Sequence, residues 1–212
     1  SGGTSASLGA QALAAHPLLP VFVSGSPDGS LLLWSFGAPQ PVGSLSGLSS
    51  SAVTRLRFDP TGSLLAVADA SGGCGIYEMA VGSSAVTARR RPLDVLDALD
   101  KKALDLAFVG RGATMLATAG VPSSSSSSSS SKARPVSIRV WDLLRPASRS
   151  CVAALSLHDG GCGALLYSSS RAQLISGGIK GDISVTNCKS WEPVVTLPAH
   201  KGAVKSLIMR PG

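Results

Sequence analysis

Apolar and polar residues alternate with a period of two in several short segments of the chain. In residues 53–58 the large apolar side chains alternate with Arg55 and Arg57, and in residues 104–108 they alternate with Asp105 and Ala107. This period indicates β-strands that turn one face toward solvent. Turn residues such as Gly, Pro and Asp separate the apolar runs. The pattern therefore predicts an all-β protein built from short strands.

A longer unit recurs roughly every 43 to 45 residues. Each copy ends with a strand, a turn built on Gly or Asp, and a second strand that closes at Trp34, Tyr77, Trp141 or Thr186. Two further apolar segments precede each of these hairpins. The interval between Tyr77 and Trp141 is about 20 residues longer than the others, because an unbroken run of serines, 123–131, interrupts the turn. Four strands per unit at this period predict a β-propeller.

The repeat sets the expected domain boundaries. We expect blades over residues 5–46, 47–98, 99–156 and 157–198, the start of another over 199–212, and a disordered Ser-rich loop over 121–135. About four blades do not close a ring, and the two end blades would expose apolar faces. We therefore expect an incomplete propeller, a fragment of a longer protein, that aggregates when expressed alone.

Residues 93–106 fit the repeat less clearly than the rest. Their apolar residues recur at a spacing of three, which is also compatible with a short helix. The register of the other copies favours an outer strand, a loop at 100–102 and the inner strand of the third blade.

The repeat resembles that of WD40 proteins, whose blades often carry a hydrogen-bonded set of a His, a Ser or Thr, an Asp and a Trp. In the first copy Ser24, Asp28 and Trp34 match three of these positions, but no His stands near residues 5–9. In the second copy Ser71 takes the Asp position and Tyr77 the Trp position. The resemblance implies a structural role for these residues.

The later copies are also incomplete. The Trp-Asp pair that names the WD40 family occurs once, at Trp141 and Asp142. His158 and Ser176 match two positions of the fourth copy, where Lys180 replaces the Asp and Thr186 replaces the Trp. His200 matches the opening position of the fifth copy. No blade has the full set, so the prediction rests on the repetition.

Charge and cysteine content narrow the classes of partner. The formal net charge is +7 at pH 7, and the densest basic run is Arg89, Arg90 and Arg91. This run is a candidate patch for acidic lipid or an acidic protein, although solvated surface charge is the simpler interpretation. We expect no nucleic-acid partner, because no recognition motif accompanies the charges. The four cysteines form no Cys-x-x-Cys pair, which favours free thiols over a metal site.

The sequence favours a binding protein over an enzyme. It contains neither a Gly-x-Ser-x-Gly elbow nor a Gly-rich phosphate loop. His158 and Asp159 could belong to a catalytic triad, but the position of His158 in the repeat favours a structural hydrogen bond. We expect no catalytic residue, no cofactor and no metal ligand. No apolar run reaches the roughly 18 residues of a membrane span.

Several stretches resemble one family more closely, the rabconnectin alpha or DmX-like proteins, whose fungal relative is the large subunit of the RAVE complex. The similarity is to their C-terminal WD40 propeller. It is carried in order by residues 16–30, 52–62, 67–72, 116–120, 141–144, 158–161, 173–181 and 199–207.

This resemblance implies a scaffold that binds peripheral-sector subunits of the V-ATPase and other subunits of a RAVE-like complex. Such a factor promotes assembly of the pump and thereby vacuolar or endosomal acidification. The implied location is cytoplasmic, with peripheral association to vacuolar and endosomal membranes. The alternative is an unrelated WD40 adaptor in trafficking, ubiquitin ligation or RNA processing.

Overall fold

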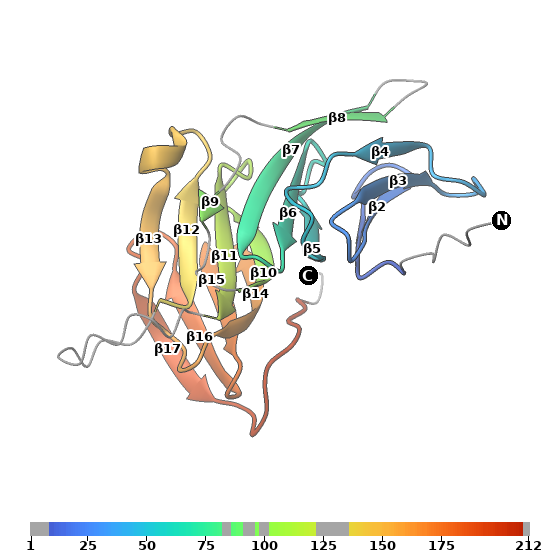
Figure 1. Cartoon of the computed structure of the whole chain (residues 1–212). Coiled ribbons are helices and arrows are strands. Elements are labelled where there is room, and N and C mark those ends of the chain that lie inside the picture. Colours follow the sequence, from blue (N-terminus) through green and yellow to red (C-terminus); the bar gives the residue numbers. More distant parts are fainter. Residues whose placement is uncertain (1–8, 82–85, 91–95, 98–101, 122–135, 210–212) are drawn as a thin grey trace.

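A computed structural model describes residues 9–81, 86–90, 96–97, 102–121 and 136–209. These residues form four antiparallel sheets that follow one another along the chain, and Figure 1 shows them side by side from the blue to the red end. In all four sheets the main strands pair in sequence order, as a meander. The all-β propeller architecture expected from the repeat is thus confirmed.

The strands have the following bounds. The first sheet contains β1 (Ala12–Ala15), β2 (Val21–Gly25), β3 (Leu31–Ser35) and β4 (Gly43–Leu45). The second contains β5 (Val53–Phe58), β6 (Leu64–Asp69), β7 (Gly73–Val81), β8 (Val86–Arg90) and β9 (Leu96–Asp97). The third contains β10 (Lys102–Val109), β11 (Met115–Val121), β12 (Ile138–Asp142) and β13 (Cys151–Leu155), with the 3-10 helix η2 (Ala147–Arg149). The fourth contains β14 (Cys162–Ser168), β15 (Gln173–Gly178), β16 (Asp182–Asn187) and β17 (Pro193–Pro198).

Apolar side chains from neighbouring sheets form the core. One cluster joins the first and second sheets, including Leu31 and Leu65. A second joins the second and third sheets, including Ile76 and Leu116, and a third joins the third and fourth, including Leu174. Because a sheet has two faces, each inner sheet of this row buries apolar residues against both neighbours.

Strand β6 shows how one strand supplies two cores. Leu65 and Val67 point into the cluster with the first sheet, whereas Ala66 and Ala68 point into the cluster with the third. Successive side chains of a strand leave opposite faces, so a continuous apolar run is needed where both faces are covered. The aromatic residues that close the repeats also pack against the preceding sheet. Tyr77 lies in the cluster with the first sheet, and Trp141 lies in the cluster with the second.

Turns between the second and third strands of a sheet lie against the next repeat. Gly29 has φ 84°, and a Cβ there would lie 2.1 Å from the carbonyl oxygen of Ser49. Gly181 has φ 96°, and a Cβ there would lie 2.0 Å from the carbonyl oxygen of His200. Only glycine combines this backbone conformation with such a close approach.

Residues 199–209 lie beside the fourth sheet without joining a ladder among the described residues. The Val204 N–H donates to the carbonyl of Gly178 at 3.0 Å, and the Val204 side chain fills the space over Gly177. Val53 makes equivalent contacts with Ser26 and Gly25 at the start of β5. Val204 therefore occupies the position at which the first strand of a blade begins.

The structure refines the interpretation of residues 93–106. The outer edge of β7 pairs with two separate strands, β8 along 77–81 and β9 along 73–74. Of the outer strand expected within 93–99, the structure describes only β9, and the longer described pairing with β7 comes from β8. The Ser-rich loop expected over 121–135 lies outside the described residues apart from Val121, which ends β11.

Candidate functional site

In the described part of the chain, the first strand of each sheet pairs on one edge only, because it stands at the end of the strand order. Its other edge presents backbone N–H and C=O groups that need partners. In β5, β10 and β14 the pairing with the second strand is interrupted at the same place, after Val53, Ala103 and Cys162. Such a bulge changes the direction of the side chains that follow it.

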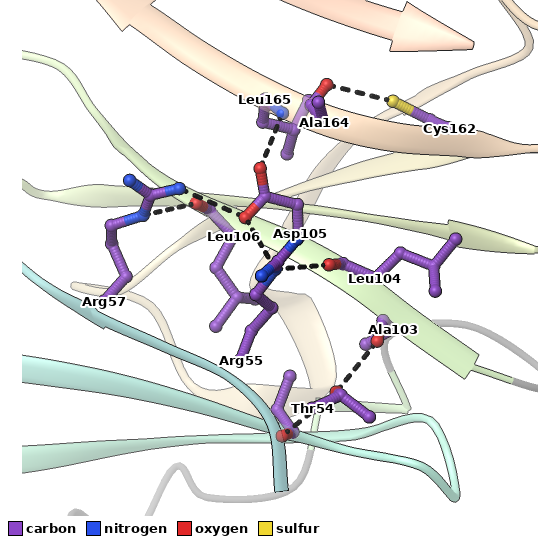
Figure 2. A network of polar contacts seen from close by, with 11 residues as sticks. Thr54, Arg55, Arg57, Ala103, Leu104, Asp105, Leu106, Cys162, Ala164 and Leu165 are labelled. Atoms are coloured by element: carbon purple, nitrogen blue, oxygen red, sulfur yellow. Dashed lines mark hydrogen bonds and ion pairs between the residues drawn. The ribbon is translucent and has the colours of Figure 1, made fainter. Parts of the chain in front are cut away.

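Side chains of β5 satisfy the free carbonyl groups of β10. Thr54 Oγ1 lies 2.9 Å from the carbonyl oxygen of Ala103, and Arg55 Nε donates to the carbonyl of Leu104 at 2.8 Å. Arg57 Nε donates to the carbonyl of Leu106 at 3.1 Å. Figure 2 shows these contacts running from the β5 ribbon to the β10 ribbon. They connect the two inner strands without a ladder between them.

Asp105 connects three inner strands. Its Oδ1 accepts from Arg57 Nη2 at 3.1 Å and lies 3.4 Å from Arg55 Nε. Its Oδ2 accepts from the backbone N–H of Leu165 on β14 at 2.8 Å (Figure 2). The Asp105 side chain is only 7% exposed, so its charge needs these partners. The alternation in residues 104–108 does not reveal this burial, because the groups that cover the carboxylate come from neighbouring strands.

A cavity of about 330 Å³ adjoins this network. It is bordered by residues 11–13 at the start of β1, residues 55–57 on β5, Asp105 on β10 and residues 205–207. The side chains of Arg55 and Arg57 are 44% and 46% exposed, and Lys205 is exposed. Three cationic groups and one carboxylate therefore line the cavity, which is a candidate binding site with excess positive charge.

The fourth sheet contains a His-centred hydrogen-bond chain. His158 Nδ1 donates to Asp182 Oδ2 at 2.5 Å, and its Nε2 lies 2.7 Å from Ser176 Oγ. The sequence register assigned the Asp position to Lys180, and that assignment is wrong. Asp182, two residues later, supplies the carboxylate, and Gly178 permits this because a Cβ there would lie 2.1 Å from Asp182 Oδ1.

This series of hydrogen bonds has the order of a Ser-His-Asp triad, but His158 and Ser176 are both 0% exposed. A nucleophile must reach its substrate. These hydrogen bonds, in which the Asp182 side chain is 24% exposed, instead fix the loop before β14 to β15 and to the start of β16. Asp159, the earlier triad candidate, lies at the border of a different cavity, of about 310 Å³, together with His200 and Lys180.

A different pair replaces the His–Asp contact in the second sheet. Asp69 Oδ2 accepts from Ser49 Oγ at 2.7 Å, and Asp69 Oδ1 accepts from the backbone N–H and the hydroxyl of Ser71. Ser71 therefore supports the carboxylate but does not replace it. Ser49 precedes Val53 by the same spacing that separates His158 from Cys162, which is the signal by which the sequence could have identified it. Tyr77 donates from its hydroxyl to the carbonyl of Ser46.

The first and third sheets keep the hydrogen bond between the Trp and the hydroxyl. Trp34 Nε1 donates to Ser24 Oγ at 2.8 Å, and Trp141 Nε1 donates to Thr118 Oγ1 at 3.1 Å. Sequence reasoning missed Thr118, although Thr118 and Ser24 each stand three residues after the first residue of their strand. In the fourth sheet Thr186 stands in the Trp position, and its buried hydroxyl has no hydrogen-bond partner among the described residues.

Two Asp residues act within turns. Asp28 is exposed and accepts from the Ser30 N–H at 3.0 Å, and that hydrogen bond lowers the pKa of the Asp28 carboxyl. Asp142 accepts from the Leu144 N–H and pairs with Arg145 Nε at 2.9 Å. His200 is exposed, and its backbone N–H donates to the carbonyl of Gly181.

The basic run is only partly described. Arg89 and Arg90 lie in β8, opposite Glu78 and Tyr77, and Arg91 lies outside the described residues. The proposed patch over Arg89, Arg90 and Arg91 therefore stays a prediction.

The four cysteines carry free thiols in different environments. Burial raises the pKa of the Cys74 and Cys162 thiols to about 12 and that of Cys188 to about 11. Cys151 is exposed. Among the described residues, no cluster of His, Cys, Asp and Glu is arranged to hold a metal ion, and no helix has the length and apolarity to span a membrane.

Comparison with known proteins agrees with this architecture. The family model described as "WD domain, G-beta repeat" matches residues 39–78. DmX-like protein 1 of Mus musculus and of Homo sapiens is 28% identical over 200 residues, which is 94% of this chain and 6% of either relative. These findings confirm the WD40 repeat and the resemblance to the DmX-like WD40 family. The chain spans only a small part of the length of these relatives.

Solved structures show the same fold. Chaetomium thermophilum Sqt1 has a TM-score of 0.70 at 20% identity, over 93% of this chain and 49% of Sqt1. Sqt1 bound to the N-terminus of the ribosomal protein L10 has a TM-score of 0.68 at 18% identity, over 92% of this chain and 50% of that one.

Two buried threonines should respond oppositely to the same substitution. Thr118→Val leaves the buried indole N–H of Trp141 without its acceptor and should lower the free energy of unfolding of the third sheet by about 1–3 kcal/mol. Thr186→Val replaces a hydroxyl that has no partner among the described residues by a methyl group of similar volume. This change should leave the stability of the fourth sheet unchanged or raise it by about 1 kcal/mol. Amide hydrogen exchange of the two sheets measures both effects. Equal destabilisation by the two changes would contradict the hydrogen-bond assignment.

Thiol labelling should separate the cysteines. At pH 8 an iodoacetamide reagent should modify Cys151 first, whereas Cys74 and Cys162 should stay unmodified, because burial keeps them protonated and inaccessible. Raising the pH to 9 should not make these two thiols reactive, since their pKa values of about 12 lie well above that pH. Peptide mass spectrometry reads the order of modification, and a denatured sample, in which all four react, is the control. Labelling of Cys74 as fast as Cys151 would refute the burial.

Proposed function

We propose that this chain is a non-catalytic WD40 scaffold and part of a RAVE- or rabconnectin-like factor that promotes V-ATPase assembly and organelle acidification. The observation that carries this proposal is the match to DmX-like protein 1 along 94% of the chain. The stretches of this chain that resemble the DmX-like family, such as residues 173–181, occur in all four sheets. A match spread over every blade favours a shared propeller more than a shared single repeat.

The packing of the sheets supports a scaffold role. Three apolar clusters join consecutive sheets, and side chains of β5 and Asp105 tie the inner strands together. A body held in this way can present loops and strand edges in fixed relative positions, which lowers the ordering cost of binding. Sqt1, which has the same fold, is seen bound to the N-terminus of the ribosomal protein L10. Protein segments are accordingly the partners we propose here.

We also propose that this chain has no catalytic activity. The most enzyme-like group, around His158, is closed to substrate because His158 and Ser176 are fully buried. Partners would be peripheral-sector subunits of the V-ATPase and further subunits of a RAVE-like complex. We also propose a cytoplasmic location, with peripheral association to vacuolar and endosomal membranes.

Affinity purification tests the function. The full-length protein, tagged and isolated from cytosol, should enrich V-ATPase peripheral-sector subunits in mass spectrometry, because the propeller supplies part of the assembly surface. The matched control is the full-length protein without residues 9–209, which should recover fewer of these subunits. Cells that carry only this control should have vacuoles or endosomes of higher pH. Equal recovery of pump subunits by both proteins would remove the propeller from the assembly function.

A further inference from the structure

The cavity beside the inner strands carries unused hydrogen-bonding capacity. Within the described part of the chain, Arg55 donates only through Nε, and Arg57 donates through Nε and Nη2. The remaining guanidinium nitrogens have no hydrogen-bond partner among the described residues, and both side chains are nearly half exposed. Lys205, near the C-terminal end of the chain, borders the same cavity. Its side chain is exposed and forms no hydrogen bond or ion pair with the described residues.

The charges at this cavity are not balanced. Asp105 is the single carboxylate among the described residues that border it, and its two oxygens are already engaged by the arginines and by the Leu165 N–H. Arg55, Arg57 and Lys205 therefore leave excess positive charge in a confined space, where the interaction with an anion is screened less than on an open surface. The excess favours an anionic ligand.

The form of the site points to the class of anion. Asp105 shows that a carboxylate fits between the two guanidinium groups, and a guanidinium fork matches a carboxylate in two parallel hydrogen bonds. The volume of about 330 Å³ is at the low end for ligand sites and accommodates a few side chains, not a folded element. The charged residues of this border also make it unlike an apolar ligand pocket.

We propose that this cavity binds the carboxylates of an acidic, extended polypeptide segment, with Arg55, Arg57 and Lys205 as its cationic contacts. The inference rests on the proposed role as a protein-binding scaffold, but not on the V-ATPase as the partner. It places the contacts with an acidic partner at the inner strands and not at the run Arg89, Arg90 and Arg91.

Fluorescence anisotropy of the full-length protein tests the site. The probe is a short fluorescein-labelled peptide of alternating Glu and Ser, compared with the same peptide carrying Gln in place of Glu and with one carrying phosphoserine and Gln. The Glu peptide should bind at low ionic strength, should weaken as salt is added, and should exceed the Gln peptide. Binding of only the phosphoserine peptide, or equal binding of the Glu and Gln peptides, would overturn the proposal.

Variants locate the binding to the cavity. Lys205→Gln should weaken binding of the Glu peptide by about fivefold, since an exposed charge is removed. Lys201→Gln, which removes the same charge from an exposed position outside the cavity, is the matched control and should have no effect. Arg55→Lys keeps the charge but loses the planar fork, and should weaken binding by about tenfold. Equal effects of Lys205→Gln and Lys201→Gln would place the binding elsewhere and refute the site.

The two proposals can fail separately. Hydrogen exchange of β10 shows whether Arg55→Lys keeps the fold, and Lys205→Gln provides a test that does not touch the β5–β10 contacts. If the peptide binds as expected while pump subunits are absent from the affinity purification, the V-ATPase role fails and the acidic-segment site stands. If pump subunits are recovered equally with wild-type protein and Lys205→Gln, while the peptide does not bind either protein, only the site is lost.

Discussion

The unpaired edge of each innermost strand is the constraint on which the centre of this structure depends. A first strand cannot pair with the first strand of the next sheet, because the sheets stack face to face. Its free carbonyl and N–H groups still need partners. The chain meets this need with side chains: Arg55 and Arg57 donate to β10, and Asp105 accepts from β14. The polar centre of the molecule is thus a consequence of its sheet topology.

The side chains that satisfy the strand edges also form a surface that can bind a ligand. A guanidinium has more donors than one or two backbone carbonyls can use. Arg55 and Arg57 satisfy the edge of β10 and still present charge to the adjoining cavity. Structural and binding roles are therefore combined in the same residues, which favours the inner strands as a place where a scaffold meets a partner.

The hydrogen bonds between loops and turns show how much variation the fold tolerates. One sheet uses His158 with Asp182, another uses Ser49 with Asp69, and the carboxylates come from different positions of the turn. What these contacts share is a carboxylate that accepts a hydrogen bond and fixes the turn to the preceding loop. The requirement is a satisfied polar pair, not a particular residue at a particular position.

The fold class and the repeat could be predicted from the sequence, because period-two alternation and closing aromatics such as Tyr77 and Trp141 are local signals. The carboxylates Asp182 and Asp69 could not be predicted, since a fixed register assumes that the carboxylate always comes from one position of the repeat. Asp105 was missed for another reason. Its burial depends on Arg57 and on the Leu165 N–H, which lie far away in sequence. Alternation indicates which way a side chain points but not what covers it.

Hydrogen exchange of the Leu165 amide in Asp105→Asn tests the central claim most directly, namely that side chains of one inner strand satisfy the edge of the next. The substitution removes the charged acceptor, so the account predicts that the Leu165 amide exchanges about tenfold faster in the full-length protein, and that protection also falls along β5. Asp142→Asn is the matched control, because its carboxylate lies in a turn of one sheet. Unchanged protection at Leu165, or the same loss in both variants, would contradict the claim.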